Sequence, residues 1–428
     1  MKLKPYPEYK DSGVEWIGEI PKDWKIKKLK HEFLLLDYKR IPLSAEFRGA
    51  MERRVYDYYG ASGVIDKVEK YIFEGEFILV GEDGANLLSR STPLAFIAKG
   101  KFWVNNHAHI LKVVNGEIIY FANLLQSIDY TPFIEGSAQP KLTAENLKKI
   151  TILSPLKSEQ KLISNYLDKK TSKIDKTIEK DTQLIELLKE KRTALINHAV
   201  TKGLDPDTKM KDSGVEWIGK IPEGWELRKF SHICDKIVVG YVGSIESFYT
   251  DAEEGIPLLK TGNVDYGKIN IENLNYVTKE FHLKNKKSQL KPGDIVIARH
   301  GESGRSSVIP PFLKEANCLN IVVLKSGKYM NGNYYSYLLN SHLIQEHLQA
   351  IQGGAVQGVV NTEDIAFLKV FYPSLKEQNQ IFNYIDEKIS KIDATIQKIE
   401  KKIELLEEYK KSLIHHVVTG KVNVLKED

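Results

Sequence analysis

The chain has 428 residues, of which 42% are hydrophobic and 28% charged, with a formal net charge of +5 and only two cysteines. This length predicts at least two domains, and the weak positive charge permits nucleic-acid binding only where basic residues cluster. The sequence excludes a disulfide framework, a four-cysteine zinc site and any run of the roughly 18 apolar residues that a membrane span needs.

The first element is a short arm that occurs twice. The N-terminus, MKLKPYPEYKDSGVEW, lacks the apolar stretch of a secretory signal, so we expect a cytoplasmic protein. Residues 10–24 read KDSGVEWIGEIPKDW and residues 211–225 read KDSGVEWIGKIPEGW, with twelve of the fifteen positions identical. The chain is therefore internally duplicated, and a repeat fixes the architecture before any motif does.

The first body follows the arm and combines strand patterns with glycine-rich loops. Residues 71–80 are rich in Ile, Val and Phe and predict a strand, and residues 81–86 predict an exposed loop. A basic stretch with a tyrosine precedes them, formed by Arg48, Arg53, Arg54 and Tyr58. Arginine can bind guanine edges or phosphate and tyrosine can contact phosphate or stack, but a solvated loop with tyrosines partly in the core is an equally good interpretation.

Two histidines in this body raise the question of a metal site. His107 and His109 could present both imidazoles on one face of a strand. No cysteine or further histidine lies nearby in the sequence, so packed or loop histidines are the simpler interpretation. We therefore expect no metal in this chain.

The first body ends in a helix, predicted over residues 120–129, and in the segment GSAQPKLTAENLKKITIL, which contains Gln139 and Lys141. Residues 157–200 then contain no glycine or proline and are rich in Lys, Glu, Leu and Ile. Pro155 precedes this run and Gly203 follows it, so the run predicts one helix of roughly 60 Å, at 1.5 Å per residue.

The second copy has the same plan with a different body. Equivalent residues of the two copies are 201 positions apart in the arm and 218 positions apart from Gly293 onwards. The second copy therefore contains 17 extra residues before Gly293, most simply within Thr261–Gln289. Strands are predicted at residues 294–298 and 318–324, and a helix at 333–351. Where the first copy reads GSAQPKLT, the second reads GGAVQGVV, so the chemistry of this loop need not match.

The constant segment returns after Pro373, and residues 374–419 again lack glycine and proline. Ser374 and Glu377 have the spacing of a capping box. Apolar residues recur at steps of four and three in both helical segments, which predicts a coiled-coil pair. The predicted seam consists of Ile174, Ile178, Ile185, Leu188, Leu195, Ile392, Ile396, Ile399, Ile403, Leu406, Leu413 and Val417.

Arg192 and Lys410 interrupt the seam at the same heptad position of the two copies. In one interpretation their stems pack in the seam while their charges reach water. In the other they fix the register of the two helices, as polar seam residues can.

The ordered, duplicated set of motifs resembles the specificity subunits of type I restriction–modification systems over essentially the whole chain. The resemblance lies in the arm SGVEWIGEIPKDW, in the strand and loop YIFEGEFILVGEDGAN and in the helix end HAVTKG. It also lies in the segment GSAQPKLTAENLKKITIL and in Pro155, Glu159 and Gln160, which follow that segment. With the duplication, it predicts an α+β protein with pseudo-two-fold symmetry. Two β-rich target recognition domains, residues 1–155 and 206–372, would be joined by a pair of long antiparallel coiled-coil spacer helices, residues 156–205 and 373–428.

The resemblance implies a non-catalytic DNA-recognition subunit. In this family each body recognises one half of a split double-stranded DNA site, and the helices dock two methyltransferase subunits and restriction subunits. S-adenosylmethionine, ATP and magnesium then belong to those partners, and we expect no cofactor, catalytic site or membrane contact in this chain. The candidate DNA-binding residues are Arg48, Arg53, Arg54, Tyr58, Ser89, Arg90, Gln139, Lys141, Arg299, His300, Arg305 and Gln357.

Gln139 and Gln357 occupy equivalent positions of the two copies. Glutamine suits adenine N6 and N7. Its presence in two bodies with different targets favours a structural or backbone role instead.

Two other function classes remain to be weighed. A self-contained enzyme is disfavoured because GxxxxGK[ST], GxGxxG and GxSxG are all absent. Residues 309–312, IPPF, resemble an amino-methyltransferase motif, but isoleucine cannot accept hydrogen bonds from a target amine. The other class is a coiled-coil adaptor that binds only proteins. A salt-dependent DNA-binding assay would distinguish such an adaptor from a DNA-recognition protein.

Overall fold

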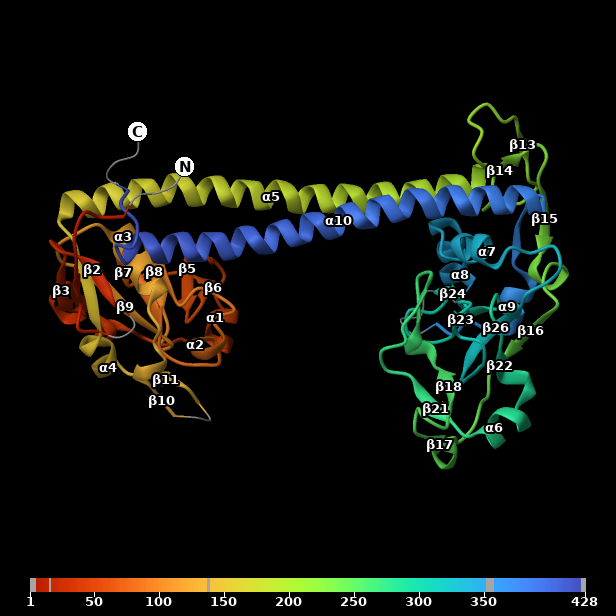
Figure 1. Ribbon diagram of the computed structural model, residues 1–428, viewed down its shortest axis with the longest axis horizontal. Helices are drawn as coiled ribbons and strands as arrows, with labels where there is room; N and C mark the ends of the chain where they lie inside the picture. Colours follow the sequence, from red (N-terminus) through yellow and green to blue (C-terminus); the bar gives the residue numbers. More distant parts are fainter. Residues whose placement is uncertain (1–4, 15–16, 137–138, 352–357, 425–428) are drawn as a thin grey trace. The chain divides into compact units, whose positions relative to one another are not determined.

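The computed structural model describes residues 5–14, 17–136, 139–351 and 358–424 (Figure 1). The chain divides into two compact units. Unit 1 contains Met1–Thr182 and Glu400–Asp428, and unit 2 contains Gln183–Ile399. We call the β-rich part of unit 1, residues 25–154, the first head, and that of unit 2, residues 226–372, the second head.

The two predicted long helices are confirmed as α5 (Lys157–Lys202) and α10 (Leu375–Val418). Both end before a glycine with positive φ, Gly203 at +79° and Gly420 at +71°, which is the left-handed conformation that terminates a helix. A Cβ at Gly420 would also overlap the Pro21 ring. Ser374 caps α10 by accepting a hydrogen bond from the backbone of Glu377 at 3.2 Å.

The first head is built on one six-stranded sheet with strand order β4-β9-β7-β8-β5-β6. These strands are β4 (Phe33–Leu35), β5 (Tyr56–Gly60), β6 (Gly63–Val68), β7 (Phe73–Gly81), β8 (Ala95–Val104) and β9 (Ala108–Val113). All pairs are antiparallel except β5 with β8. Along β7, Ile78 and Val80 face the core under α3 (Ile118–Ser127), while Phe77 and Leu79 face a second apolar cluster. The central strand is therefore apolar on both faces.

The second head has two larger sheets in place of one. One has the order β16-β26-β23-β24, with β16 (Lys236–Val239), β23 (Ile295–Ala298), β24 (Ser306–Val308) and β26 (Ile321–Lys325). The other has the order β17-β21-β18-β25-β22, with β17 (Tyr249–Thr250), β18 (Ile256–Leu259), β21 (Asn275–Val277), β22 (Gln289–Leu290) and β25 (Ala316–Cys318). The region of the expected insertion, Thr261–Gln289, contains β19 (Val264–Asp265), β20 (Lys268–Ile269), β21 and α6 (Lys279–Lys284).

Two predicted elements of the second head were wrong in extent. The strand expected at residues 318–324 is split into β25 and β26, because Asn320 between them adopts a left-handed φ of +54°. The helix expected at residues 333–351 is split into α7 (Gly332–Leu339) and α8 (His342–Ile351). Asn340, between them, bonds both the backbone N–H (2.9 Å) and the carbonyl (2.8 Å) of Ser306, which ends α7 there.

Both copies repeat the same small elements around their heads. The arms form hairpins, β1 (Tyr9–Asp11) with β2 (Glu19–Pro21) and β13 (Met210–Asp212) with β14 (Lys220–Pro222). Each head closes with a two-stranded sheet, β3 (Lys25–Lys28) with β12 (Thr151–Ser154) and β15 (Glu226–Lys229) with β27 (Lys369–Tyr372). The remaining short elements are α1 (Ala45–Gly49), α2 (Asn86–Ser89), β10 (Ile134–Glu135), β11 (Lys141–Leu142), α4 (Ala144–Lys149) and α9 (Thr362–Phe367).

Equivalent hydrogen bonds hold each head, together with the tryptophan that directly precedes it, to the helices. The Trp24 indole donates to Glu159 at 3.0 Å in unit 1, and the Trp225 indole donates to Glu377 at 2.8 Å in unit 2. The Tyr120 hydroxyl donates to the carbonyl of Val418 at 3.3 Å, and the Tyr334 hydroxyl to that of Val200 at 3.2 Å. Each head is thus fixed to the start of the helix that follows it and to the end of the other helix.

Within each unit, parts of α5 and α10 pack against each other. In unit 1, Lys402 pairs with Asp181 at 2.8 Å and Lys410 with Asp175 at 2.6 Å, so one residue number falls as the other rises and the pairing is antiparallel. In unit 2, Arg192 pairs with Asp393 at 3.4 Å. All twelve residues of the predicted seam are buried or half-buried. The α+β fold with long paired helices is therefore confirmed.

Among the residues that the structure describes, no helix combines the length and the apolar character needed to cross a membrane.

Candidate nucleic-acid interface

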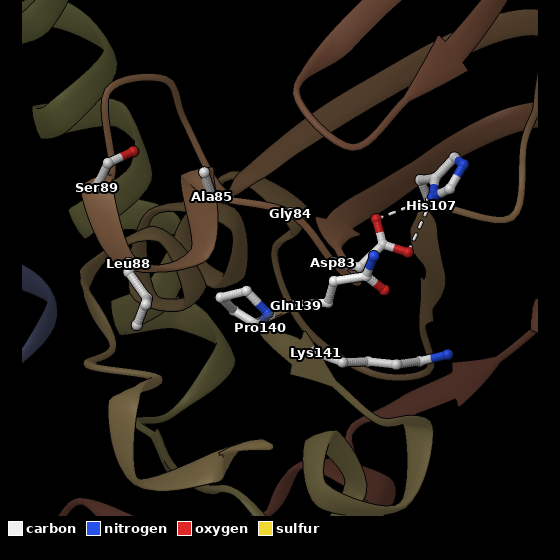
Figure 2. A pocket seen from close by; sticks show the side chains of 9 residues that line it. All are labelled: Asp83, Gly84, Ala85, Leu88, Ser89, His107, Gln139, Pro140 and Lys141. Carbon is white, nitrogen blue, oxygen red and sulfur yellow. Dashed lines mark hydrogen bonds and ion pairs between the residues drawn. The ribbon is translucent and has the colours of Figure 1, made fainter. Parts of the chain in front are cut away.

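A pocket of about 930 Å³ opens on the first head between the loop after β7, α2, the loop before β9 and the segment that leads into β11 (Figure 2). Three predicted site residues, Ser89, Gln139 and Lys141, line it, although about 50 residues separate the first from the others. All three side chains are exposed. The pocket thus collects a hydroxyl, an amide and a cation, each able to bond phosphate or a base edge.

The two sides of the pocket are joined by backbone hydrogen bonds. Gly84 donates to the carbonyl of Pro140 at 3.1 Å, and Leu142 donates to that of Glu82 at 2.7 Å. His107, which the sequence analysis did not count as a DNA-binding residue, lines the pocket and bonds Asp83 at 2.8 Å, as Figure 2 shows. The glycine-rich composition of residues 81–86 was the sequence signal for this loop.

A buried ionic network lies beside this pocket. Glu82 pairs with Arg40 and, at 3.2 Å, with Lys141. His109, which is fully buried, bonds Asp37 through Nδ1 and the carbonyl of Leu142 through Nε2, the latter at 2.7 Å. Burial raises the pKa of Asp37, but the hydrogen bond and charge of His109, a backbone hydrogen bond and the charge of Arg40 outweigh it and hold that pKa below its usual value.

The same network bears on the metal question. Ligand atoms of Asp37, Glu82 and His109 lie within 4.8 Å of one another, a spacing that a metal ion could bridge. In this conformation, however, Arg40 and Lys141 already neutralise Glu82, and both ring nitrogens of His109 have oxygen partners. The protein's own cations and N–H groups therefore satisfy the cluster.

The basic stretch of the first head is partly turned inward. Arg48 pairs with Asp66 at 2.8 Å and lies over the Tyr58 ring at 4.6 Å, and Tyr58 itself is 1% exposed. The hydrogen bond from Arg48 is the main reason that the pKa of Asp66 is lowered. Arg53 and Arg54 are exposed, and Arg54 lies 3.4 Å from the same Asp66 carboxylate. Of the three arginines in this stretch, Arg53 and Arg54 therefore present their charge at the surface.

Arg90 has a structural partner as well. It adopts a left-handed φ of +49°, and its guanidinium donates to the carbonyls of Gln126 and, at 2.7 Å, Ile128. These carbonyls lie at the C-terminal end of α3, where a cation is favourable.

In the second head the predicted residues have different surroundings. Arg299 donates to Asn320 at 2.8 Å, to Asn361 at 3.1 Å and to the carbonyl of Val360 at 3.2 Å. Arg305 is half-buried and pairs with Glu302 at 3.2 Å, while His300 is exposed. Gln357 lies outside the described residues.

Comparisons with known proteins all find the same family. A family model described as "Type I restriction modification DNA specificity domain" matches residues 21–189 and 222–405. The chain is 24% identical over 418 residues to the type I restriction enzyme MjaVIII specificity subunit of Methanocaldococcus jannaschii, covering 95% of this chain and 94% of that protein. It is 29% identical over 337 residues to a putative type I restriction enzyme specificity subunit, S.HindORF215P, of Haemophilus influenzae, covering 77% and 79%.

Solved structures share the fold. A chain from work on "complex assembly and conformational transition of the type I R-M system" superimposes with a TM-score of 0.68 at 13% identity, covering 93% of this chain and 98% of that one. The HsdS subunit from Thermoanaerobacter tengcongensis gives a TM-score of 0.56 at 13% identity, covering 96% and 100%.

Proposed function

Since the chain belongs to the family of type I restriction–modification DNA specificity subunits, we propose that each of its two heads recognises one half of a bipartite double-stranded DNA site. The family acts in DNA recognition and not in catalysis. The observation that carries the proposal is the contrast between frame and heads. The Trp–Glu and Tyr–carbonyl bonds that fix each head recur in both copies, whereas the sheets differ. One frame with two different heads suits a site with two different halves.

In the first head, the pocket residues Ser89, Gln139 and Lys141 are the proposed DNA contacts. Lys141 is 52% exposed and can reach a phosphate while it remains paired with Glu82. Gln139 can bond an adenine edge through its amide. If it does not, its role is structural or lies in contact with the DNA backbone. Among the candidates of the second head that the structure describes, His300, next to Arg299, is exposed.

The paired helices are the proposed docking site for two modification subunits and for restriction subunits. Many charged side chains of α5 and α10 are exposed. Apolar side chains such as Leu187 and Leu405, at 60% and 52% exposure, lie among them and could contact a protein partner. S-adenosylmethionine, ATP and magnesium would be bound by those partners, and the complex would act on DNA in the cytoplasm.

The proposal is tested with the purified full chain and its modification partner. The chain alone should bind duplex DNA with a salt-dependent affinity, should not bind S-adenosylmethionine, and should direct methylation to one split sequence once the partner is added. Stoichiometric S-adenosylmethionine binding by the pure chain, or DNA binding that does not change with salt, would contradict the proposal.

A further inference from the structure

One backbone carbonyl is held by a side-chain donor in both heads, but the donor differs. Leu142 and Val360 are equivalent residues of the two copies, since they are 218 positions apart and each directly precedes the N-cap residue of α4 or α9, Thr143 or Asn361. The carbonyl of Leu142 accepts from His109 Nε2 at 2.7 Å. The carbonyl of Val360 accepts from Arg299 Nε at 3.2 Å.

The two donors come from different positions, and each head lacks the donor of the other. His109 pairs with Val80 on β7, and Ala298, the equivalent of Val80, pairs with Ile321 on β26. Isoleucine has no hydrogen-bond donor, so the second head cannot use this position. The donor Arg299 comes one residue after Ala298, at the position where the first head has Gly81.

Gly81 leaves little room for a side chain in the first head. A Cβ there would lie 3.0 Å from the carbonyl oxygen of Ala61. At these two positions the first head therefore has His109 and Gly81, whereas the second head has Ile321 and Arg299. Two different solutions to one requirement indicate that the carbonyl must be held, whichever strand supplies the donor.

The chemistry of each donor suits this role. A carbonyl only accepts, so His109 Nε2 donates to Leu142, while Nδ1 lies against the Asp37 carboxylate and holds the ring from its other side. Arg299 is also held on its other side, by Asn320 and Asn361. Both carbonyls thus accept from a rigidly held donor that cannot turn away.

In the first head, the held residue directly follows the segment that carries two of the proposed DNA contacts. In the first head, Lys141 and Gln139 lie one and three residues before Leu142, and both line the pocket. The backbone N–H of Leu142 is fixed to Glu82 at 2.7 Å, and that of Val360 to Arg299 at 3.1 Å. The side-chain donor therefore fixes the carbonyl side of the same residue and, in the first head, helps to orient the adjoining Lys141.

We infer that His109 and Arg299 are equivalent positioning residues, each of which sets the sequence preference of its own head without contacting DNA. This inference rests on the proposed function. It assigns Arg299 a role inside the second head and not at a base edge, and it gives the buried His109 a role in half-site recognition.

The test uses the full chain and four variants, His109→Leu, His109→Gln, Arg299→Leu and Arg299→Lys. The exposed histidines His31 and His232 are equivalent residues of the two copies, so His31→Leu and His232→Leu are matched controls. The first readout is amide hydrogen exchange without DNA. The His109→Leu variant should speed exchange at Leu142 about tenfold while Val360 keeps its rate, Arg299→Leu should do the reverse, and Gln and Lys should retain part of the protection.

The second readout is binding to duplexes that carry the native site with one half randomised at a time. The His109→Leu variant should lose base preference in one half-site and Arg299→Leu in the other, with both controls unchanged. Unaltered exchange at Leu142 and Val360 would overturn the inference, as would equal loss of preference in both halves by either variant. A wild-type chain without base preference would instead overturn the proposed function, and the exchange rates would still decide whether these residues hold the loop.

Discussion

Lys410 Nζ lies 2.6 Å from the Asp175 carboxylate of the other long helix. The same pair recurs in the other copy as Arg192 and Asp393, at 3.4 Å. The sequence left two interpretations of these seam cations, packed stems with solvated charges or a device that fixes register. Because each cation has an equivalent carboxylate partner on the opposite helix, the structure favours the second interpretation.

Reversing one charge of this pair should cost stability, and reversing both should restore part of it. The Lys410→Asp and Asp175→Lys variants each place like charges together, whereas the double variant rebuilds the pair with opposite polarity. The side chains are 31% and 53% exposed, so a coupling of about 0.2–1 kcal/mol is expected, decreasing with salt. Urea unfolding of the four proteins measures it. The exposed pair Lys401–Glu404 within α10 is the control, and additive effects at Lys410 and Asp175 would refute a role in register.

Glu159 should matter more to stability than its equivalent Glu377. The Glu159 carboxylate accepts from the Trp24 indole at 3.0 Å and from the Tyr6 hydroxyl at 2.7 Å, whereas Glu377 accepts from the Trp225 indole at 2.8 Å. An unsatisfied buried donor costs about 1–3 kcal/mol. Glu159→Ala should therefore destabilise unit 1 by more than Glu377→Ala destabilises unit 2.

The glutamine variants provide the comparison for these two positions. Glutamine keeps an acceptor, so Glu159→Gln and Glu377→Gln should cost less than the alanine variants. Unfolding followed by tryptophan fluorescence reports both units. Equal losses for alanine and glutamine at both positions would mean that the indole bonds do not fix the heads.

Both cysteines should be unreactive in the folded chain near neutral pH. Burial raises the pKa of Cys234 to about 11 and that of Cys318 to about 12. At pH 8 the reactive thiolate is then about one part in a thousand for Cys234 and about one part in ten thousand for Cys318. The rate of modification by an aromatic disulfide should rise about tenfold per pH unit from 8 to 10, with Cys234 reacting first. In urea both should react at the rate of an ordinary thiol; an equally fast reaction in the folded chain would contradict their burial.

Substitution at Gln139 and Lys141 should separate base recognition from phosphate contact. Lys141→Ala should weaken binding to all sequences alike and reduce the salt dependence by about one phosphate contact. Gln139→Ala should relax preference at one base pair if the amide contacts a base, and should leave preference unchanged if its role is structural. Because Lys141 also pairs with Glu82 at 3.2 Å, the unfolding free energy of each variant has to be compared with its DNA affinity. Retention of full affinity and preference by both variants would exclude the pocket as a DNA contact.

The elements that the sequence predicted best are those determined locally. The run from Lys157 to Val200 has no helix breaker and a regular seam, and α5 covers it entirely. The strand expected at residues 71–80 is found at Phe73–Gly81. The break at Asn320 was missed because an apolar run does not reveal a single left-handed residue.

The site could be predicted only in part, because its contacts join distant segments. Ser89, Gln139 and Lys141 were selected by residue type, and only the fold brings them to one pocket. Arg48 and Tyr58 carry the same signal in the sequence but are turned toward Asp66 and the core. His109 gave no sign of its role, because its partners Asp37 and Leu142 lie 72 and 33 residues away. The domain boundaries at residues 155, 205 and 372 stay a prediction.

The central claim is that two separate heads recognise two halves of one DNA site. The most direct test exchanges residues 25–150 for the corresponding body of another family member and maps methylated adenines in a genome modified by the hybrid complex. The native complex, mapped in parallel, gives the reference site. We expect the hybrid to keep one half-site unchanged and to replace the other. Alteration of both halves, or of neither, would contradict the account.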